Sequence, residues 1–122
     1  MRLYFAHPMS EYGTKREAKA LKAIKKRWPY AKLFNPNHKK HQEGYETMGW
    51  LYFETLASSM DVVVAMAYPD GEWGMGVFAE MKSANNRNSE LLQVHDDGTF
   101  SEVNLIYIRP LSILETSRRN RK

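Results

Sequence analysis

The chain has 122 residues, of which 43% are hydrophobic, and both values are typical of one globular domain with its own core. It contains no cysteine, which excludes disulfides, thiolate catalysis and cysteine-bound zinc, and no apolar run is long enough to cross a bilayer. The formal net charge of +4 permits contact with phosphate or nucleic acid, and we expect a soluble, cytoplasmic protein that needs no membrane, metal or cofactor.

Residues 2–6 predict the first strand, and His7-Pro8 ends it because proline lacks a backbone donor and keeps its predecessor extended. The first ten residues lack the pattern of a signal sequence. At the carboxyl end of this strand, Tyr4 offers a hydroxyl and His7 a titratable imidazole. Both also have plain structural interpretations, Tyr4 as a core aromatic and His7 as a hydrogen-bonding loop residue.

A basic amphipathic helix is expected next. Its apolar residues recur at helical spacing on one face: Ala18, Leu21, Ile24 and Trp28. Ser10 or Thr14 can cap this helix, and Pro29 should end it. Residues 31–34 then predict a weak second strand, with turn residues beginning at Asn35.

Residues 39–44 have the composition of an exposed loop, and His38 and His41 beside them would hold a metal only if a third ligand converged. Residues 45–59 predict one helix, with Glu54 at the border of its apolar stripe. The residues of that stripe are Met48, Leu51, Tyr52, Thr55 and Leu56.

Residues 61–84 combine a buried strand, a glycine-containing turn and a helix. The β-branched run at 62–66 is typical of a strand covered on both faces, and the turn at 68–71 ends it. Gly74-Met75-Gly76 leads into a helix that carries Glu80. The apolar face of this helix comprises Val77, Met81 and Ala84.

Strand ends and helix starts meet at one edge of a parallel sheet, which is where such folds bind ligands. Gly74 and Gly76 would let the backbone approach a ligand there, and the free N–H groups of the helix start would attract an anion such as phosphate. Glu80 would then be an ionised carboxylate facing a cleft. Alternatively, the glycines only form a tight turn and Glu80 is a solvated helix residue.

The rest of the chain predicts a hairpin, a last strand and a short helix. Residues 91–94 and 100–103 flank the turn Asp96-Asp97-Gly98, residues 105–108 predict the last strand, and residues 111–119 predict the helix. A basic tail occupies residues 117–122. It could contact nucleic acid, or it could be a disordered, solvated segment.

This order of elements predicts an α/β fold over residues 1–122: a three-layer α/β/α sandwich, flavodoxin-like or Rossmann-like, with a mainly parallel sheet of about five strands. The carboxyl edge of the sheet should gather a polar site. Its expected members are Tyr4, His7, Asn35, Asp70, Gly74, Gly76 and Glu80.

Across residues 3–84 the chain resembles the nucleoside 2-deoxyribosyltransferase-like superfamily, which includes deoxynucleoside 5′-monophosphate N-glycosidases. The resemblance rests on the opening strand and loop at 3–9, on Phe34-Asn35-Pro36, and on the run 60–64. Its most specific part is the Gly-x-x-x-Glu-x-x-x-Ala spacing of residues 76–84, which is also similar to that of cytokinin-activating phosphoribohydrolases.

The resemblance implies that Glu80 is the nucleophile that attacks the anomeric carbon of a ribose or deoxyribose, as in retaining glycosidases. It implies that Tyr4 positions Glu80 or the sugar. We expect the following residues at the sheet edge to bind the substrate: Tyr4, Ala6, His7, Pro8, Asp70, Gly74 and Gly76.

Two positions depart from the pattern of the family. Several members carry an aspartate that assists the leaving base eight residues before the residue matching Asp61, where this chain has Phe53. The neighbouring Glu54 is the candidate acid, although one step along a helix turns a side chain by about 100°. The transferases also carry an aspartate six residues before the nucleophile, where this chain has Gly74.

Two functions therefore follow as hypotheses. The first is cleavage or transfer of the N-glycosidic bond of a nucleoside or nucleoside 5′-monophosphate, with Glu80 as nucleophile and Glu54 as acid. The second is a non-catalytic nucleotide-binding or nucleic-acid-associated module of the same fold. We expect Trp50 and Tyr52 to be exposed aromatic residues, which favours a homodimer. The resemblance to the family also implies a homodimer.

Overall fold

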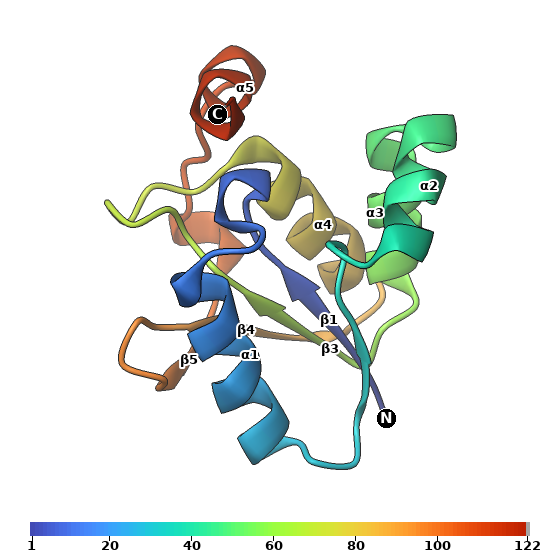
Figure 1. The fold of residues 1–122 in the computed structure, drawn as a ribbon, viewed down its shortest axis with the longest axis vertical. Helices are drawn as coiled ribbons and strands as arrows, with labels where there is room; N and C mark the ends of the chain where they lie inside the picture. The colour runs from blue at the N-terminus through green and yellow to red at the C-terminus, as the bar shows by residue number, and fades with distance from the viewer. Residues whose placement is uncertain (122) are drawn as a thin grey trace.

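The computed structural model describes residues 1–121 and contains a five-stranded sheet in the order β2-β1-β3-β4-β5 (Figure 1). The first four strands are parallel, and β5 runs antiparallel to β4. The strands are β1 (Arg2–Ala6), β2 (Lys32–Phe34), β3 (Val62–Ala65), β4 (Glu90–Val94) and β5 (Phe100–Glu102).

The helices cover both faces of this sheet. They are α1 (Lys15–Arg27), α2 (Lys39–Met48), α3 (Trp50–Ser58), α4 (Met75–Asn85) and α5 (Ile113–Asn120), with short 3₁₀ helices η1 (Met9–Glu11) and η2 (Leu105–Tyr107). Helix α1 packs on one face, α3 and α4 pack on the other, and α2 lies against α3 (Figure 1). The predicted three-layer α/β/α fold is confirmed.

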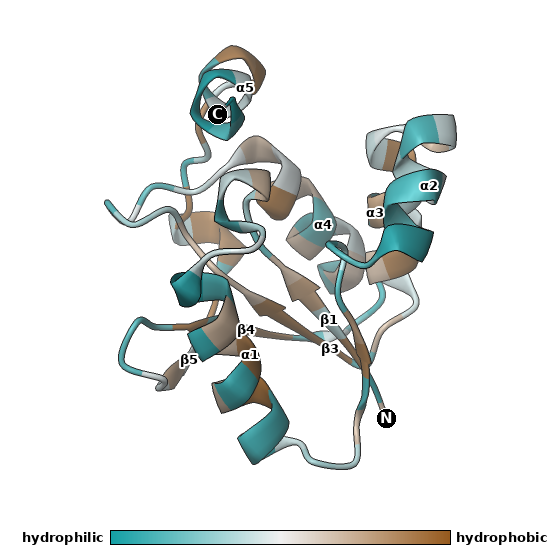
Figure 2. Ribbon diagram, in the orientation of Figure 1, coloured by the Kyte–Doolittle hydropathy of each residue, from teal (hydrophilic) through white to brown (hydrophobic). Residues whose placement is uncertain are grey.

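The core follows from the alternation of side chains along the central strands. In β1, Tyr4 points to the side of α3 and α4, whereas Leu3 and Phe5 point to the side of α1. In β3, Val63 and Val64 face opposite sides in the same way, and both are fully buried. The central strands are accordingly hydrophobic while the exposed faces of α1 and α2 are hydrophilic (Figure 2).

Several predicted boundaries are confirmed. Strand β1 spans residues 2–6 as expected, and α1 begins after Thr14, whose Oγ1 accepts the N–H of Glu17 at 3.2 Å. Helix α1 ends at Arg27, and its C-cap Trp28 is the residue before Pro29. The turn at 96–98 joins β4 and β5, with Gly98 at a positive φ of 84°.

The prediction of a loop at 39–44 and of one helix over 45–59 was wrong. Residues 39–48 form α2, because the His38 imidazole accepts the N–H of Lys40 at the helix start. Gly49 then separates α2 from α3 with φ 63° and ψ −147°, a conformation that favours glycine. After this break, α3 packs on the core through Phe53 and Ala57, which are buried. Leu51, which we expected in the core, is 58% exposed.

The last predicted strand, residues 105–108, is also wrong. Residues 105–107 form η2, because the side chain of Asn104 accepts the N–H of Ile106 at 3.2 Å and starts a helical turn. Ile106 and Tyr107 are exposed, so this segment lacks the buried side that a strand of the sheet would need. Within residues 1–121, none of the helices combines the length and the apolarity needed to cross a membrane.

Candidate functional site

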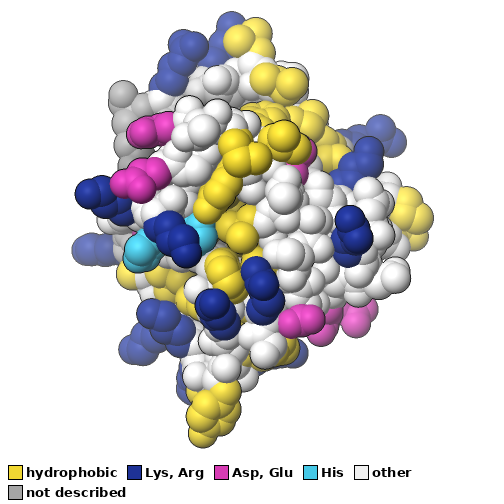
Figure 3. Space-filling view, turned by 90° about the vertical axis from the view of Figure 1, so that its right-hand side faces the viewer, with side chains coloured by type: hydrophobic (Ala, Val, Ile, Leu, Met, Phe, Trp, Pro, Cys, Tyr) yellow, Lys and Arg dark blue, Asp and Glu magenta, His cyan; other side chains and the backbone are white. Residues whose placement is uncertain are grey.

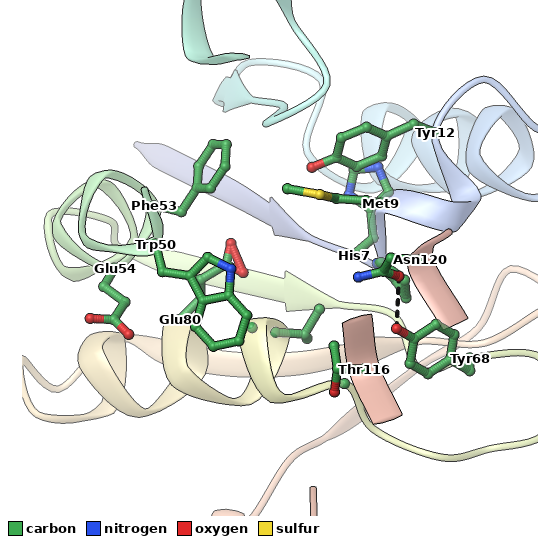
Figure 4. Close-up of a pocket in the computed structure, with 14 residues that line it drawn as sticks. His7, Met9, Tyr12, Trp50, Phe53, Glu54, Tyr68, Glu80, Thr116 and Asn120 are labelled. Carbon is green, nitrogen blue, oxygen red and sulfur yellow. Dashed lines mark hydrogen bonds between the residues drawn. The ribbon is translucent and has the colours of Figure 1, made fainter. Parts of the chain in front are cut away.

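The strand order reverses between β1 and β3, since the chain passes from β1 outward to β2 and then returns to the other side of β1. In open α/β sheets, a crevice forms at this reversal beyond the carboxyl ends of the strands. A pocket opens there (Figure 4). Six of the expected site residues line it: His7, Pro8, Glu54, Gly74, Gly76 and Glu80.

Glu80 is the buried acid of this pocket. It lies in the second turn of α4, is 8% exposed, and its Oε1 accepts a 2.5 Å hydrogen bond from the hydroxyl of Tyr4 in β1. Burial raises the pKa of Glu80 to about 8, the hydrogen bond from Tyr4 opposes this, and the charge of Glu54 adds to it. Glu80 is therefore mainly protonated at neutral pH, not ionised as the sequence led us to expect.

Glu54 contributes to the pocket from α3 but in a different direction. Figure 4 shows its carboxylate turned away from the carboxyl group of Glu80, on the other side of the Trp50 indole. This is the rotation expected of a residue one position away from Phe53, whose ring does point toward the pocket. The structure thus brings Glu54 near the site without directing its oxygens into it.

His7 is held by the protein on both of its ring nitrogens. Nδ1 lies 3.0 Å from the carbonyl oxygen of Phe5, and Nε2 lies 2.6 Å from Oε2 of Glu17. The imidazole also stacks on the ring of Phe5, with centroids 3.9 Å apart. Burial opposes ionisation of Glu17, but hydrogen bonds from His7 and from the N–H of Gly13 lower its pKa overall. His7 therefore presents its ring to the pocket while its polar atoms are engaged.

Three expected site residues lie elsewhere. Asp70 is exposed and forms a 2.8 Å ion pair with Arg119, outside the pocket lining. Asn35 accepts the N–H of Asn37 within its turn, and Ala6 is fully buried inside the sheet. Sequence proximity to a strand end did not bring these side chains into the crevice.

The two glycines are close to protein side chains. A Cβ on Gly74 would lie 3.2 Å from the ring of Tyr68, and one on Gly76 would lie 3.8 Å from the indole of Trp50. Gly74 has an ordinary extended backbone with φ −71°, so close packing, not an unusual conformation, explains a glycine there.

Helix α5 covers the start of α4. The sequence analysis did not place α5 at the site. Thr116 accepts the N–H of Met75 on its Oγ1 at 3.0 Å, and thereby caps a helix whose own N-cap, Gly74, has no side chain. Tyr68 donates its hydroxyl proton to Oδ1 of Asn120 at 2.8 Å. No local sequence signal could reveal these contacts, because they join segments that are distant in the chain.

Aromatic and thioether side chains form a further part of the lining. The sequence analysis did not assign them to the site: Met9, Tyr12, Trp50 and Phe53. Burial raises the pKa of Tyr12, so its phenol stays neutral. Trp50 and Tyr52 are half-buried and not exposed as expected, and Tyr52 bonds to His41 at 2.7 Å. The homodimer stays a prediction.

The empty space of the pocket, including the part that is open to bulk solvent, measures about 510 Å³. The carboxyl group of Glu80 borders this recess.

Basic side chains are not clustered around the pocket in the described part of the chain. On the molecular face above α2 and α3, lysines and arginines are dispersed among hydrophobic and acidic side chains (Figure 3). Within residues 1–121, no group of three or more His, Asp or Glu side chains could hold a metal ion, and His38 and His41 have no third ligand. Of the basic tail, Ser117 to Asn120 belong to α5, and Lys122 lies outside the described residues.

A comparison of the chain with models of known protein families, with curated proteins and with solved structures gave no match.

Proposed function

We propose that the protein cleaves or transfers the N-glycosidic bond of a nucleoside or nucleoside 5′-monophosphate through Glu80. The observation that carries the proposal is a buried carboxyl group at the switch point of the sheet, fixed by the hydroxyl of Tyr4 and open to a recess. The resemblance to the nucleoside 2-deoxyribosyltransferase-like superfamily points to the same residue.

In this reaction the Glu80 carboxylate attacks the anomeric carbon, and the bond from that carbon to the base nitrogen breaks with its electron pair going to the base. Water or a second base then displaces Glu80 from the sugar. Because Tyr4 binds Oε1, Oε2 is the oxygen available for attack. The hydrogen bond also stabilises the charged form of Glu80.

The raised pKa of Glu80 gives the mechanism a pH requirement, since only the ionised carboxylate is a nucleophile. With a pKa of about 8, roughly a tenth of the molecules carry the carboxylate at pH 7. The rate of base release should therefore increase as the pH rises toward 8 and above.

One observation favours the second candidate function, a nucleotide-binding module without catalysis. Glu54 is the other acidic residue that lines the pocket within the described chain, and its carboxylate is turned away from the recess. The leaving base would then lack an acid to protonate it, which typically costs about 10²–10⁴ in rate.

A chromatographic screen of nucleosides and 5′-monophosphates for released base separates the two functions. We expect the wild-type protein and the Glu72→Gln variant, altered at an exposed carboxylate, to release base, and Glu80→Gln to release none. Base release by Glu80→Gln at the wild-type rate would exclude Glu80 as nucleophile. Binding of nucleosides without turnover by the wild type would favour the module.

A further inference from the structure

The pocket has two chemically different ends with Glu80 between them. Figure 4 shows Trp50 and Phe53 on one side of the Glu80 carboxyl group, and Thr116 and Asn120 on the other. One end is aromatic and can stack on a flat heterocycle. The other end is polar and comes from α5.

The polar end has a fixed orientation. Because the Tyr68 hydroxyl donates to Oδ1 of Asn120, the amide NH₂ of Asn120 is directed away from Tyr68 and into the recess (Figure 4). Thr116 uses Oγ1 to accept the N–H of Met75, so its hydroxyl proton remains a donor. These are neutral donors, which suit the hydroxyl oxygens of a sugar.

The same end has no cation for a phosphate. No lysine or arginine of residues 1–121 lines the pocket. The nearby Arg119 is bound to Asp70 at 2.8 Å and lies over the ring of Tyr68, 5.1 Å from its centroid. The first N–H of α4 is already satisfied by Thr116. A phosphate dianion placed there would lose its hydration without gaining a counter-charge, which is unfavourable.

We propose that the site takes an uncharged nucleoside in preference to its 5′-phosphate, with the base against Trp50 and the sugar hydroxyls on Asn120 and Thr116 of α5. This substrate class rests on the proposed function of Glu80. It makes Asn120 a specificity-determining residue and α5 the element that excludes the phosphate.

The first experiment compares a purine nucleoside with its 5′-monophosphate, both for turnover by the wild type and for binding to Glu80→Gln by calorimetry. We expect the nucleoside to be favoured at least tenfold in both measurements. Equal or better use of the monophosphate would overturn the substrate class while leaving Glu80 as nucleophile. Preferential nucleoside binding without turnover would keep the substrate class and refute the catalytic function. Binding of neither compound would refute both.

The second experiment tests Asn120 with a double-mutant cycle. In Asn120→Ala we expect nucleoside binding to weaken about fivefold, the typical effect of one lost hydrogen bond. Binding of the matched 5′-deoxynucleoside, which lacks the terminal hydroxyl, should change less than twofold. In Tyr68→Phe the amide of Asn120 is free to rotate, so we expect a smaller loss of nucleoside binding. This loss should again be larger for the nucleoside than for its 5′-deoxy analogue. Equal weakening of both compounds would show that Asn120 acts only through the structure of α5.

Discussion

Tyr4 and Glu80 are joined by a hydrogen bond of 2.5 Å although they are separated by 76 positions in the sequence. Tyr4 is fully buried in β1, so its hydroxyl is a fixed donor to the carboxyl group of Glu80. The bond compensates part of the cost of burying a carboxyl group, and it selects which oxygen faces the recess. Both the stability of the protein and its proposed chemistry therefore depend on this pair.

The first prediction concerns stability and pH. Burial raises the pKa of Glu80 from 4.5 to about 8, so below about pH 4.5 folded and unfolded chains are both protonated at this group. As the pH rises toward 8, the unfolded chain ionises first and the free energy of unfolding falls, on the order of 5 kcal/mol in total. Urea unfolding at pH 5, 7 and 9 measures this fall.

The variant Glu80→Gln should lose most of this decline between pH 5 and pH 8, because glutamine does not titrate. Comparison in identical buffers also removes the opposite contribution of His41, whose pKa burial lowers. Glu72→Gln, altered at an exposed carboxylate, serves as the matched control and should retain the decline. A decline of equal size in wild type and Glu80→Gln would contradict the assignment.

The second prediction concerns the pH profile of base release. Because the nucleophile must be ionised, we expect kcat/KM of the folded enzyme to rise about tenfold per pH unit below pH 7 and to level off above about pH 8. Initial rates measured by chromatography from pH 6 to 9 test this. A rate that falls over the same range would indicate that protonated Glu80 acts as an acid instead.

The third prediction concerns Tyr4→Phe, which removes only the hydroxyl. Glu80 would lose the hydrogen bond that opposes its pKa increase, so its pKa should rise further and the rise of the rate with pH should move to higher pH. The buried carboxyl group would also lose its partner, at a cost of about 1–3 kcal/mol in the free energy of unfolding. Urea unfolding and the pH profile measure the two effects separately.

The fourth prediction concerns the contact between α5 and α4. Thr116→Val keeps the shape of the side chain but removes the oxygen that accepts the N–H of Met75. We expect a loss of about 1 kcal/mol in stability and faster amide hydrogen exchange in α5. The exposed Thr55→Val serves as control and should change neither measurement. Unchanged exchange in Thr116→Val would show that the cap does not hold α5.

The fifth prediction contrasts two glycines that lie in helices. Replacing a helical glycine by alanine normally stabilises by about 1 kcal/mol. At Gly44 the new Cβ would lie 2.3 Å from the ring of Tyr52, which His41 holds in place, so we expect Gly44→Ala to destabilise by about 1–3 kcal/mol. Gly76→Ala makes only an ordinary 3.8 Å contact and should be neutral or stabilising. Urea unfolding of both variants checks the difference in sign.

The parts of the fold that depend on local pattern were predictable. The β-branched run of β3 and the proline after α1 are strong signals, and both elements are close to where the sequence placed them. Gly49 was a weaker signal: a glycine between two helical stretches can end a helix, yet the continuing apolar pattern indicated one helix. The 3₁₀ turn at Leu105–Tyr107 has a strand-like composition but no neighbouring strand to bind.

The site was predictable only where a residue follows directly from a strand end or a motif. Glu80 and Gly74 reach the pocket because α4 begins beside the end of β3. Thr116 and Asn120 reach it because α5 returns across α4, and the sequence of a short polar helix does not indicate where that helix will pack. The charge state of Glu80 was also hidden, because desolvation depends on the packing of the whole chain.

The position of α5 also governs the order in which the pocket forms during synthesis. The residues of α5 follow those of β1, β3 and α4 in the chain, so the wall that carries Asn120 is the last of these parts to leave the ribosome. Only release of the later residues completes the recess. Peptides or tags attached next to Asn120 would crowd that wall, whereas additions before Met1 would lie away from it.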